Sequence, residues 1–214
     1  MYSVITADLV KSSEFKNKRK YVLKTLNEIF NQLKIKKKKN IHIWISDIFR
    51  GDSFQIVVSD AAYALRIALF LRSQLIQKSI VGMEFDARIS IGIGSIEYLN
   101  HEKLLQSDGE AFRLSGRSID EIPNFRRLVI KSSNEELNHV FEMISALIDA
   151  ITMRWSAEQA EAISYWIFGE TQTSLAKIIG ISQSAIQQRL QLAGHFAIEA
   201  CLNHFNSIMN KYKV

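Results

Sequence analysis

Two aspartates beside strand-like segments are the first candidates for chemistry in this sequence. Asp8 follows the first apolar run of the chain, and Asp52 lies in a polar turn. That turn separates residues 41–45 from residues 54–58, two runs rich in Ile, Val and Phe, which predicts a β-hairpin. If the strands that carry the two aspartates are neighbours in one sheet, the carboxylates converge. A divalent cation that holds a phosphate requires such a pair of oxygen ligands.

The segments around these aspartates alternate between strand and helix patterns. Apolar residues at helical spacing alternate with short runs of β-branched residues. Helices are expected from Ser12 or Ser13 to about Leu33, from Asp60 to about Gln77 and over residues 135–151, and strands at 85–96 and 125–131. The order strand, helix, hairpin, helix, strand indicates an α+β fold with helices on an antiparallel sheet.

Three motifs in this order resemble those of class III nucleotidyl cyclases. The runs DLVKSS (8–13) and GDSF (51–54) resemble the two metal motifs, and ARISIGIG (87–94) resembles a core strand. The resemblance implies a ferredoxin-like, cyclase-like domain over residues 1–131, a homodimer, and Mg²⁺ or Mn²⁺ held by Asp8 and Asp52. It also implies that Lys11, Ser12 and Ser13 approach the nucleotide phosphates, with Lys11 in place of a glycine of the family.

A further segment, residues 107–117, resembles the cyclase helix that carries the transition-state arginine. Arg117 corresponds to that arginine, Arg113 replaces an asparagine, and Asp108 takes the place of the base-facing acid. The two arginines lie one helical turn apart, so they can hold a phosphate together; the alternative is two ordinary exposed residues. The lysine that reads the purine is replaced by Ile48, which has no hydrogen-bonding side chain. The resemblance therefore implies altered base specificity, another nucleotide or lost turnover.

Residues 152–214 are predicted to form an all-α domain, joined to the first by a helix over residues 132–151 that either links the domains or dimerises. The run Leu175–Ile186 has the pattern of a helix-turn-helix, with Gly180 at the turn and Ser182 capping the second helix. It resembles region four of sigma factors, and the chain as a whole is similar to the SatD family. The candidate DNA-binding residues follow the cap: Gln183, Ser184, Gln187, Gln188 and Arg189.

The charge pattern gives this second domain little attraction for DNA. Residues 152–201 contain three Lys or Arg and four acids, so the net charge is 3 − 4 = −1, and phosphate contacts supply much of DNA affinity. Residues 16–39 contain ten Lys or Arg and one acid, which either attract a polyanion or form a solvated helix face. The polar helix can therefore read bases or contact a protein, including a second copy.

The composition excludes several classes of protein. Hydrophobic residues make up 47% and charged residues 23% of the chain, as in globular proteins, and the single Cys201 rules out an intramolecular disulfide. The sequence has no signal-peptide pattern and no apolar run of about 20 residues, so a cytoplasmic protein without a membrane partner is expected. We expect a nucleotide-responsive DNA-binding transcriptional regulator with a cyclase-like sensor. The alternatives are an active metal-dependent cyclase of unusual base specificity and a purely structural or protein-binding module.

Overall fold

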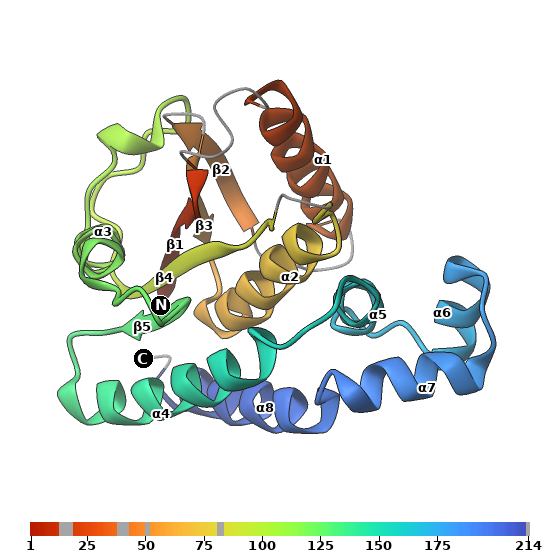
Figure 1. Ribbon diagram of the computed structural model, residues 1–214. Coiled ribbons are helices and arrows are strands. Elements are labelled where there is room, and N and C mark those ends of the chain that lie inside the picture. Colours follow the sequence, from red (N-terminus) through yellow and green to blue (C-terminus); the bar gives the residue numbers. More distant parts are fainter. Residues whose placement is uncertain (13–18, 38–42, 50–51, 81–83, 213–214) are drawn as a thin grey trace.

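The computed structural model describes residues 1–12, 19–37, 43–49, 52–80 and 84–212. Five strands form one sheet in the order β2-β3-β1-β4-β5 (Figure 1). The strands are β1 (Tyr2–Leu9), β2 (Ile43–Phe49), β3 (Ser53–Val58), β4 (Ala87–Gly94) and β5 (Leu128–Lys131). All neighbouring pairs are antiparallel except β4 and β5, which are parallel. The expected α+β class is confirmed.

Helices cover both faces of this sheet. Side chains alternate along a strand, so Ile5 and Ala7 of β1 point into the main apolar core, which they share with two helices. Val4, on the other face, packs against the third helix in a smaller cluster. The helices on the main-core face are α1 (Arg19–Lys37) and α2 (Ala64–Ile76), and the helix on the opposite face is α3 (Glu110–Glu121) (Figure 1). A short 3-10 helix, η2 (Ala61–Tyr63), precedes α2 and is capped by Asp60.

The hairpin is tighter than the sequence predicts. Strand β2 continues to Phe49, which pairs with Ser53, so Asp47 and Ile48 belong to the strand instead of the turn. Ile48 packs against the main core, which explains an apolar residue at this position. The expected helix start at Ser13 lies outside the described residues.

The C-terminal part of the chain is helical, as expected. Its helices are α4 (Glu135–Thr152), α5 (Ala157–Trp166), α6 (Gln172–Ile179), α7 (Gln183–Leu192) and α8 (His195–Lys211). Ser156 and Gln159 form a capping box at the start of α5. Gly180 adopts the left-handed conformation (φ 78°) after α6, and Ser182 caps α7. Within the described ranges, no helix is long and apolar enough to cross a bilayer.

One apolar core runs from the sheet into these helices. Buried residues of α4, α5, α7 and α8 belong to the same cluster as those of β1, β3, β4 and α2. Phe70 of α2 meets Phe168 after α5 at 5.0 Å between ring centroids, and Phe141 of α4 meets Phe205 of α8 at 5.7 Å. The cluster thus crosses both expected domain boundaries, after residues 131 and 151.

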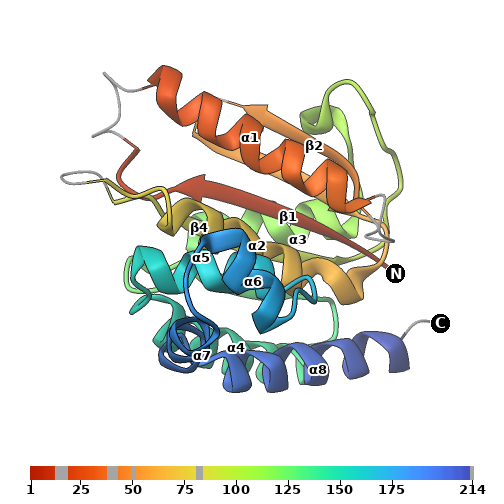
Figure 2. The ribbon, with the colours of Figure 1, turned by 90° about the vertical axis from the view of Figure 1, so that its right-hand side faces the viewer.

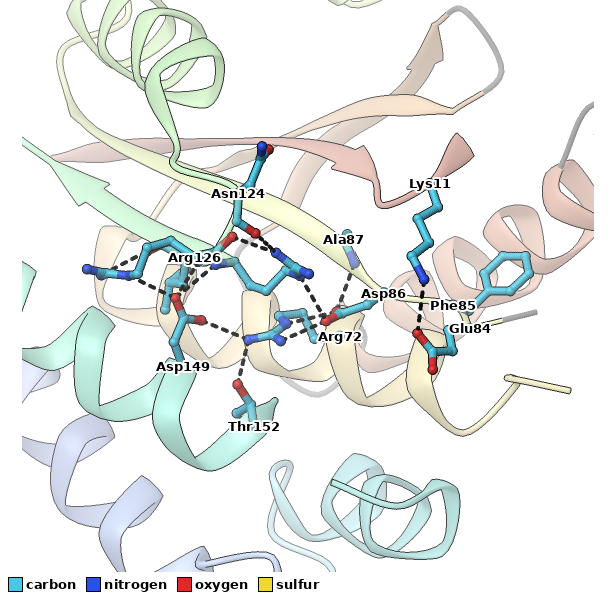
Figure 3. Close-up of polar contacts among 12 residues, drawn as sticks. Lys11, Arg72, Glu84, Phe85, Asp86, Ala87, Asn124, Arg126, Asp149 and Thr152 are labelled. Atoms are coloured by element: carbon cyan, nitrogen blue, oxygen red, sulfur yellow. Dashed lines mark hydrogen bonds and ion pairs between the residues drawn. The ribbon is translucent and has the colours of Figure 1, made fainter. Parts of the chain in front are cut away.

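A buried charged network also joins the two parts (Figure 3). Arg72 of α2, with a side chain only 1% exposed, pairs with Asp86 at 2.8 Å and with Asp149 of α4 at 3.1 Å. Asp149 also pairs with Arg126 at 3.0 Å and accepts a hydrogen bond from the backbone N–H of Arg127 at 2.9 Å. Burial opposes the charge of Arg72, but the two carboxylates more than compensate and raise its pKa.

Candidate functional site

The carboxylate of Asp8 lies between side chains of the two neighbouring strands. In the sheet register, Asp8 pairs with Ser53 of β3 and with Arg88 of β4. Its Oδ1 accepts a hydrogen bond from Ser53 Oγ at 3.0 Å, and its Oδ2 lies 2.9 Å from Arg88 Nη2. The Asp8 side chain is 27% exposed. The carboxylate is therefore anchored at one end of the sheet and still reaches solvent.

Asp52 lies beside this position because β1 and β3 are paired. The backbone N–H of Leu9 donates to the carbonyl of Asp52 at 3.0 Å, so Asp52 is the residue next to the pairing partner of Asp8. Asp52 is half-buried. The structure therefore brings the backbones of the two aspartates together at one end of the sheet.

A buried polar cluster supports Asp8 from one step further along β1. Thr6 donates to Ser115 of α3 at 2.9 Å and accepts from Gln55 Nε2 at 3.1 Å. Gln55 Oε1 and Ser90 Oγ are buried without a hydrogen-bond partner among the described residues. Because side chains alternate along strands, Thr6 and Asp8 share the face of the sheet that α3 covers. A further acid, Asp47, shares this face through its pairing with Gln55.

The residues after β1 occupy a turn. Lys11 is the only described non-glycine residue with a positive φ, 56°, a conformation that glycine adopts without steric cost. Its ammonium group lies 3.5 Å from the carboxylate of Glu84 (Figure 3). Ser12 is half-buried, and Ser13 lies outside the described residues.

The donor set matches a cation that arrives with a phosphate ligand. Among the described residues, no group of three or more His, Cys, Asp or Glu side chains is placed to hold a metal by itself. Mg²⁺ commonly uses one or two carboxylates together with waters and substrate phosphates. A carboxylate has about four lone-pair sites, and Ser53 and Arg88 use two of those on Asp8. Asp8 thus retains acceptor capacity beyond these two contacts, and Asp52 is the acid beside it.

Two other residues implied by the cyclase resemblance, Asp108 and Arg113, lie toward the opposite end of β1, where Ala111 of α3 donates its backbone N–H to the carbonyl of Ser95. Asp108 forms an isolated bridge with Tyr98, in the segment after β4. Arg113 pairs with Glu97 and with Asp108, each at 2.8 Å, and hydrogen bonding to Glu97 is the main cause that raises its pKa. Arg117 is exposed. The two ends of β1, Tyr2 and Asp8, are six residues apart, which corresponds to about 20 Å. Within a single chain, Asp108 and Arg113 are therefore too far from the aspartate pair to share a site with it.

The candidate DNA-binding residues divide into two groups. Four polar residues on α7 are exposed: Gln183, Ser184, Gln187 and Gln188. Arg189 is turned toward α5, where its guanidinium lies 3.0 Å from Glu161, and its side chain is only 24% exposed. Ile186 and Leu190 are fully buried and fix the orientation of α7. The exposed surface of α7 is therefore uncharged, and it is polar except at the C-terminal end, where Leu192 is 66% exposed.

Two site residues were missed by the sequence reasoning. Arg88 belongs to the strand motif that resembles the cyclases, but its pairing with Asp8 depends on the register of β1 and β4. Gln55 follows the GDSF motif and is revealed only by its contact with Thr6. Alternation along the two strands indicates which face these residues share, whereas β1 is joined to neither β3 nor β4 by a short turn that would fix the register.

Comparison with known protein families identifies the family of the chain. A family model described as SatD family matches residues 2–198. The match includes the sheet, α1 to α7 and the first residues of α8. None of the curated proteins compared with the chain matches it.

Proposed function

Since the chain belongs to the SatD family, we propose on physical grounds that it is a DNA-binding transcriptional regulator whose sheet domain senses a nucleotide. The observation that carries the proposal is the exposed, uncharged face of α7 with Gln183, Gln187 and Gln188. Glutamine can read an adenine edge with two hydrogen bonds. The face is held on a rigid helix by buried Ile186 and Leu190.

The connection between α6 and α7 supports a helix-turn-helix. Gly180 supplies the left-handed turn, and its N–H donates to the carbonyl of Ala176 at 2.9 Å. Leu175 and Ile186, one from each helix, are fully buried. In this motif the N-terminal part of the second helix enters the major groove, and that part of α7 carries Gln183 and Gln187.

The sensor assignment is supported by the strand order and by the aspartate pair. The order β2-β3-β1-β4 with α1 and α2 on one face has the pattern of a ferredoxin-like, cyclase-like domain. Asp8 and Asp52 would hold Mg²⁺ or Mn²⁺ that arrives with a nucleoside triphosphate. Lys11 and Ser12, in the turn after β1, would lie near its phosphates. The ion pair between Arg72 of α2 and Asp149 of α4 provides a physical connection from the sheet domain to the C-terminal helices.

The DNA proposal is tested by selecting duplexes from a random pool with the full chain, with and without triphosphate. We expect one enriched sequence, and we expect Gln187→Ala/Gln188→Ala to lose the enrichment at unchanged thermal stability. Asn203→Ala, an exposed substitution on α8, serves as the matched control and should keep it. A pool without enrichment under either condition would contradict DNA reading.

The nucleotide proposal is tested separately by thermal unfolding with each ribonucleoside triphosphate, with and without Mn²⁺. A ligand at ~100 times its dissociation constant adds about 2.7 kcal/mol. We expect a metal-dependent upward shift in Tm with one triphosphate, absent in Asp52→Ala and present in the control Asp120→Ala. Equal responses of the two variants would show that any binding lies elsewhere.

A second candidate is an active nucleotidyl cyclase of unusual base specificity. The observation that favours it is the adjacency of Asp8 and Asp52 at one end of β1, with exposed Arg117 on α3. The cyclase resemblance implies a head-to-tail second copy that offers Arg117 to the aspartates and supplies charge to the transition state. Release of pyrophosphate with a cyclic nucleotide, lost in Asp52→Ala, would favour this candidate. Triphosphate binding without turnover would favour the sensor.

A further inference from the structure

Helix α4 presents an apolar stripe on the side turned away from the core. Met143 is 57% exposed and Leu147 53% exposed, and Ala150 is exposed beside them. In Figures 1 and 2, α4 and α8 run along the lower edge of the molecule, away from α1. Large apolar side chains gathered on one exposed helix face mark a contact surface.

The stripe has the spacing of a coiled-coil seam. From Glu136 onward, its positions follow one another at intervals of four and three residues in turn, which is the a/d pattern of a heptad repeat. The seam consists of Glu136, Val140, Met143, Leu147, Ala150 and Arg154. Val140 lies at the border of the seam, since it is half-buried and also packs against the main core. Arg154 lies in the turn after α4, where its backbone N–H donates to the carbonyl of Ile151 at 3.2 Å.

The seam is complementary to itself when a second copy runs in the opposite direction. It is symmetric about residue 145, so Met143 faces the partner's Leu147 and Glu136 faces the partner's Arg154. The two-fold axis repeats each contact. A parallel pair would instead place Glu136 against its own copy, an unfavourable contact of like charges.

The two terminal charges are free to make this contact. Glu136 and Arg154 are exposed, and neither side chain has an ion pair with another described residue of its own chain. The apolar centre supplies burial, and the opposite charges at the ends select the antiparallel direction and the register.

We propose that α4 forms the interface of a homodimer in which two copies pair antiparallel through this seam. The proposal is independent of nucleotide or DNA binding. One helix per copy makes a small interface, so the dimer dissociates in the micromolar range.

Sedimentation velocity of the full chain, over roughly 1 to 100 μM, tests the interface. The wild type is expected to shift from monomer to dimer across this range, and Leu147→Glu to remain monomeric. Leu105→Glu, at another exposed leucine (63%), is the matched control and should dimerise like the wild type. A monomeric wild type throughout, or an unchanged dimer in Leu147→Glu, overturns the proposal.

A charge exchange tests the direction of pairing. Glu136→Arg and Arg154→Glu should each weaken the dimer at least threefold in dissociation constant, whereas the double variant should return to within about twofold of the wild type. In a Cys201→Ala background, a mixture of Glu136→Cys and Arg154→Cys chains should form a disulfide-linked dimer, whereas Glu136→Cys alone should not. Cross-linking of Glu136→Cys to itself, or a double variant as weak as the single ones, overturns the antiparallel seam.

Discussion

At the scale of single residues, the backbone of Lys11 marks where β1 ends and the candidate phosphate turn begins. A side chain in the left-handed region costs about 1–2 kcal/mol, whereas glycine avoids that cost but loses more entropy on folding. We therefore expect Lys11→Gly to be about 0.5–1 kcal/mol more stable than Lys11→Ala in urea unfolding. Both variants lose the Glu84 pair, so their difference reports the backbone alone.

The same two substitutions at Lys20, exposed in the first turn of α1, provide the control. There the order should reverse, with Ala more stable than Gly by up to about 1 kcal/mol, because the backbone is helical. An Ala variant as stable as the Gly variant at position 11 would contradict the left-handed assignment.

Residue types near the site could be predicted from the sequence, but their partners could not. The sequence predicts that the carboxylates of Asp8 and Asp52 converge if their strands are neighbours, and the backbone hydrogen bond between Leu9 and Asp52 makes the two backbones neighbours. Arg189, predicted to face DNA, pairs with Glu161 on another helix. That contact depends on the angle between α5 and α7, which no local spacing encodes.

At the scale of elements, Gly92 determines how closely α3 approaches the sheet. A Cβ atom there would lie 2.2 Å from the carbonyl oxygen of Ala111 and 2.6 Å from the backbone nitrogen of Ser115. Since backbone atoms cannot move aside as a flexible side chain does, we expect Gly92→Ala to destabilise the protein by about 3 kcal/mol or more. Chemical denaturation measures the change in free energy of unfolding.

Gly116, next to Ser115 in α3, is the matched control. A Cβ atom there would meet nothing within 4 Å, and alanine favours the helix by up to about 1 kcal/mol. Gly116→Ala is therefore expected to stabilise the protein. Equal effects of the two alanines would contradict the close packing of α3 on β4.

Element types followed from the sequence more readily than element ends. The capping box at Ser156 and the left-handed Gly180 are local signals, and the structure has both. The end of β2 could not be predicted from the sequence, because pairing with β3 extends the strand through Asp47 and Ile48 to Phe49. Strand ends depend on a partner strand, whereas helix caps depend on neighbouring residues in the chain.

At the scale of the whole molecule, the continuous core and the charged network make the sheet and the C-terminal helices depend on each other. Asp149 of α4 holds Arg72 of α2 and Arg126 before β5, and it also accepts backbone N–H groups there. The expected boundary near residue 151 follows from local sequence patterns, whereas the buried contacts that join the two parts depend on residues that are distant in the sequence.

Asp149→Asn should therefore destabilise both parts together. The substitution preserves shape but removes one of the two carboxylates that neutralise buried Arg72, while Asp86 remains, so we expect a loss of about 1–3 kcal/mol. Glu142→Gln also removes a partner of Arg126, but Glu142 is 56% exposed, so a loss below about 1 kcal/mol is expected.

Hydrogen exchange measured by mass spectrometry should show faster exchange in β1 and β4 as well as in α4 and α8 of Asp149→Asn. Faster exchange confined to the helices would mean that the two parts unfold separately, since a single cooperative unit transmits the lost stability to every core element.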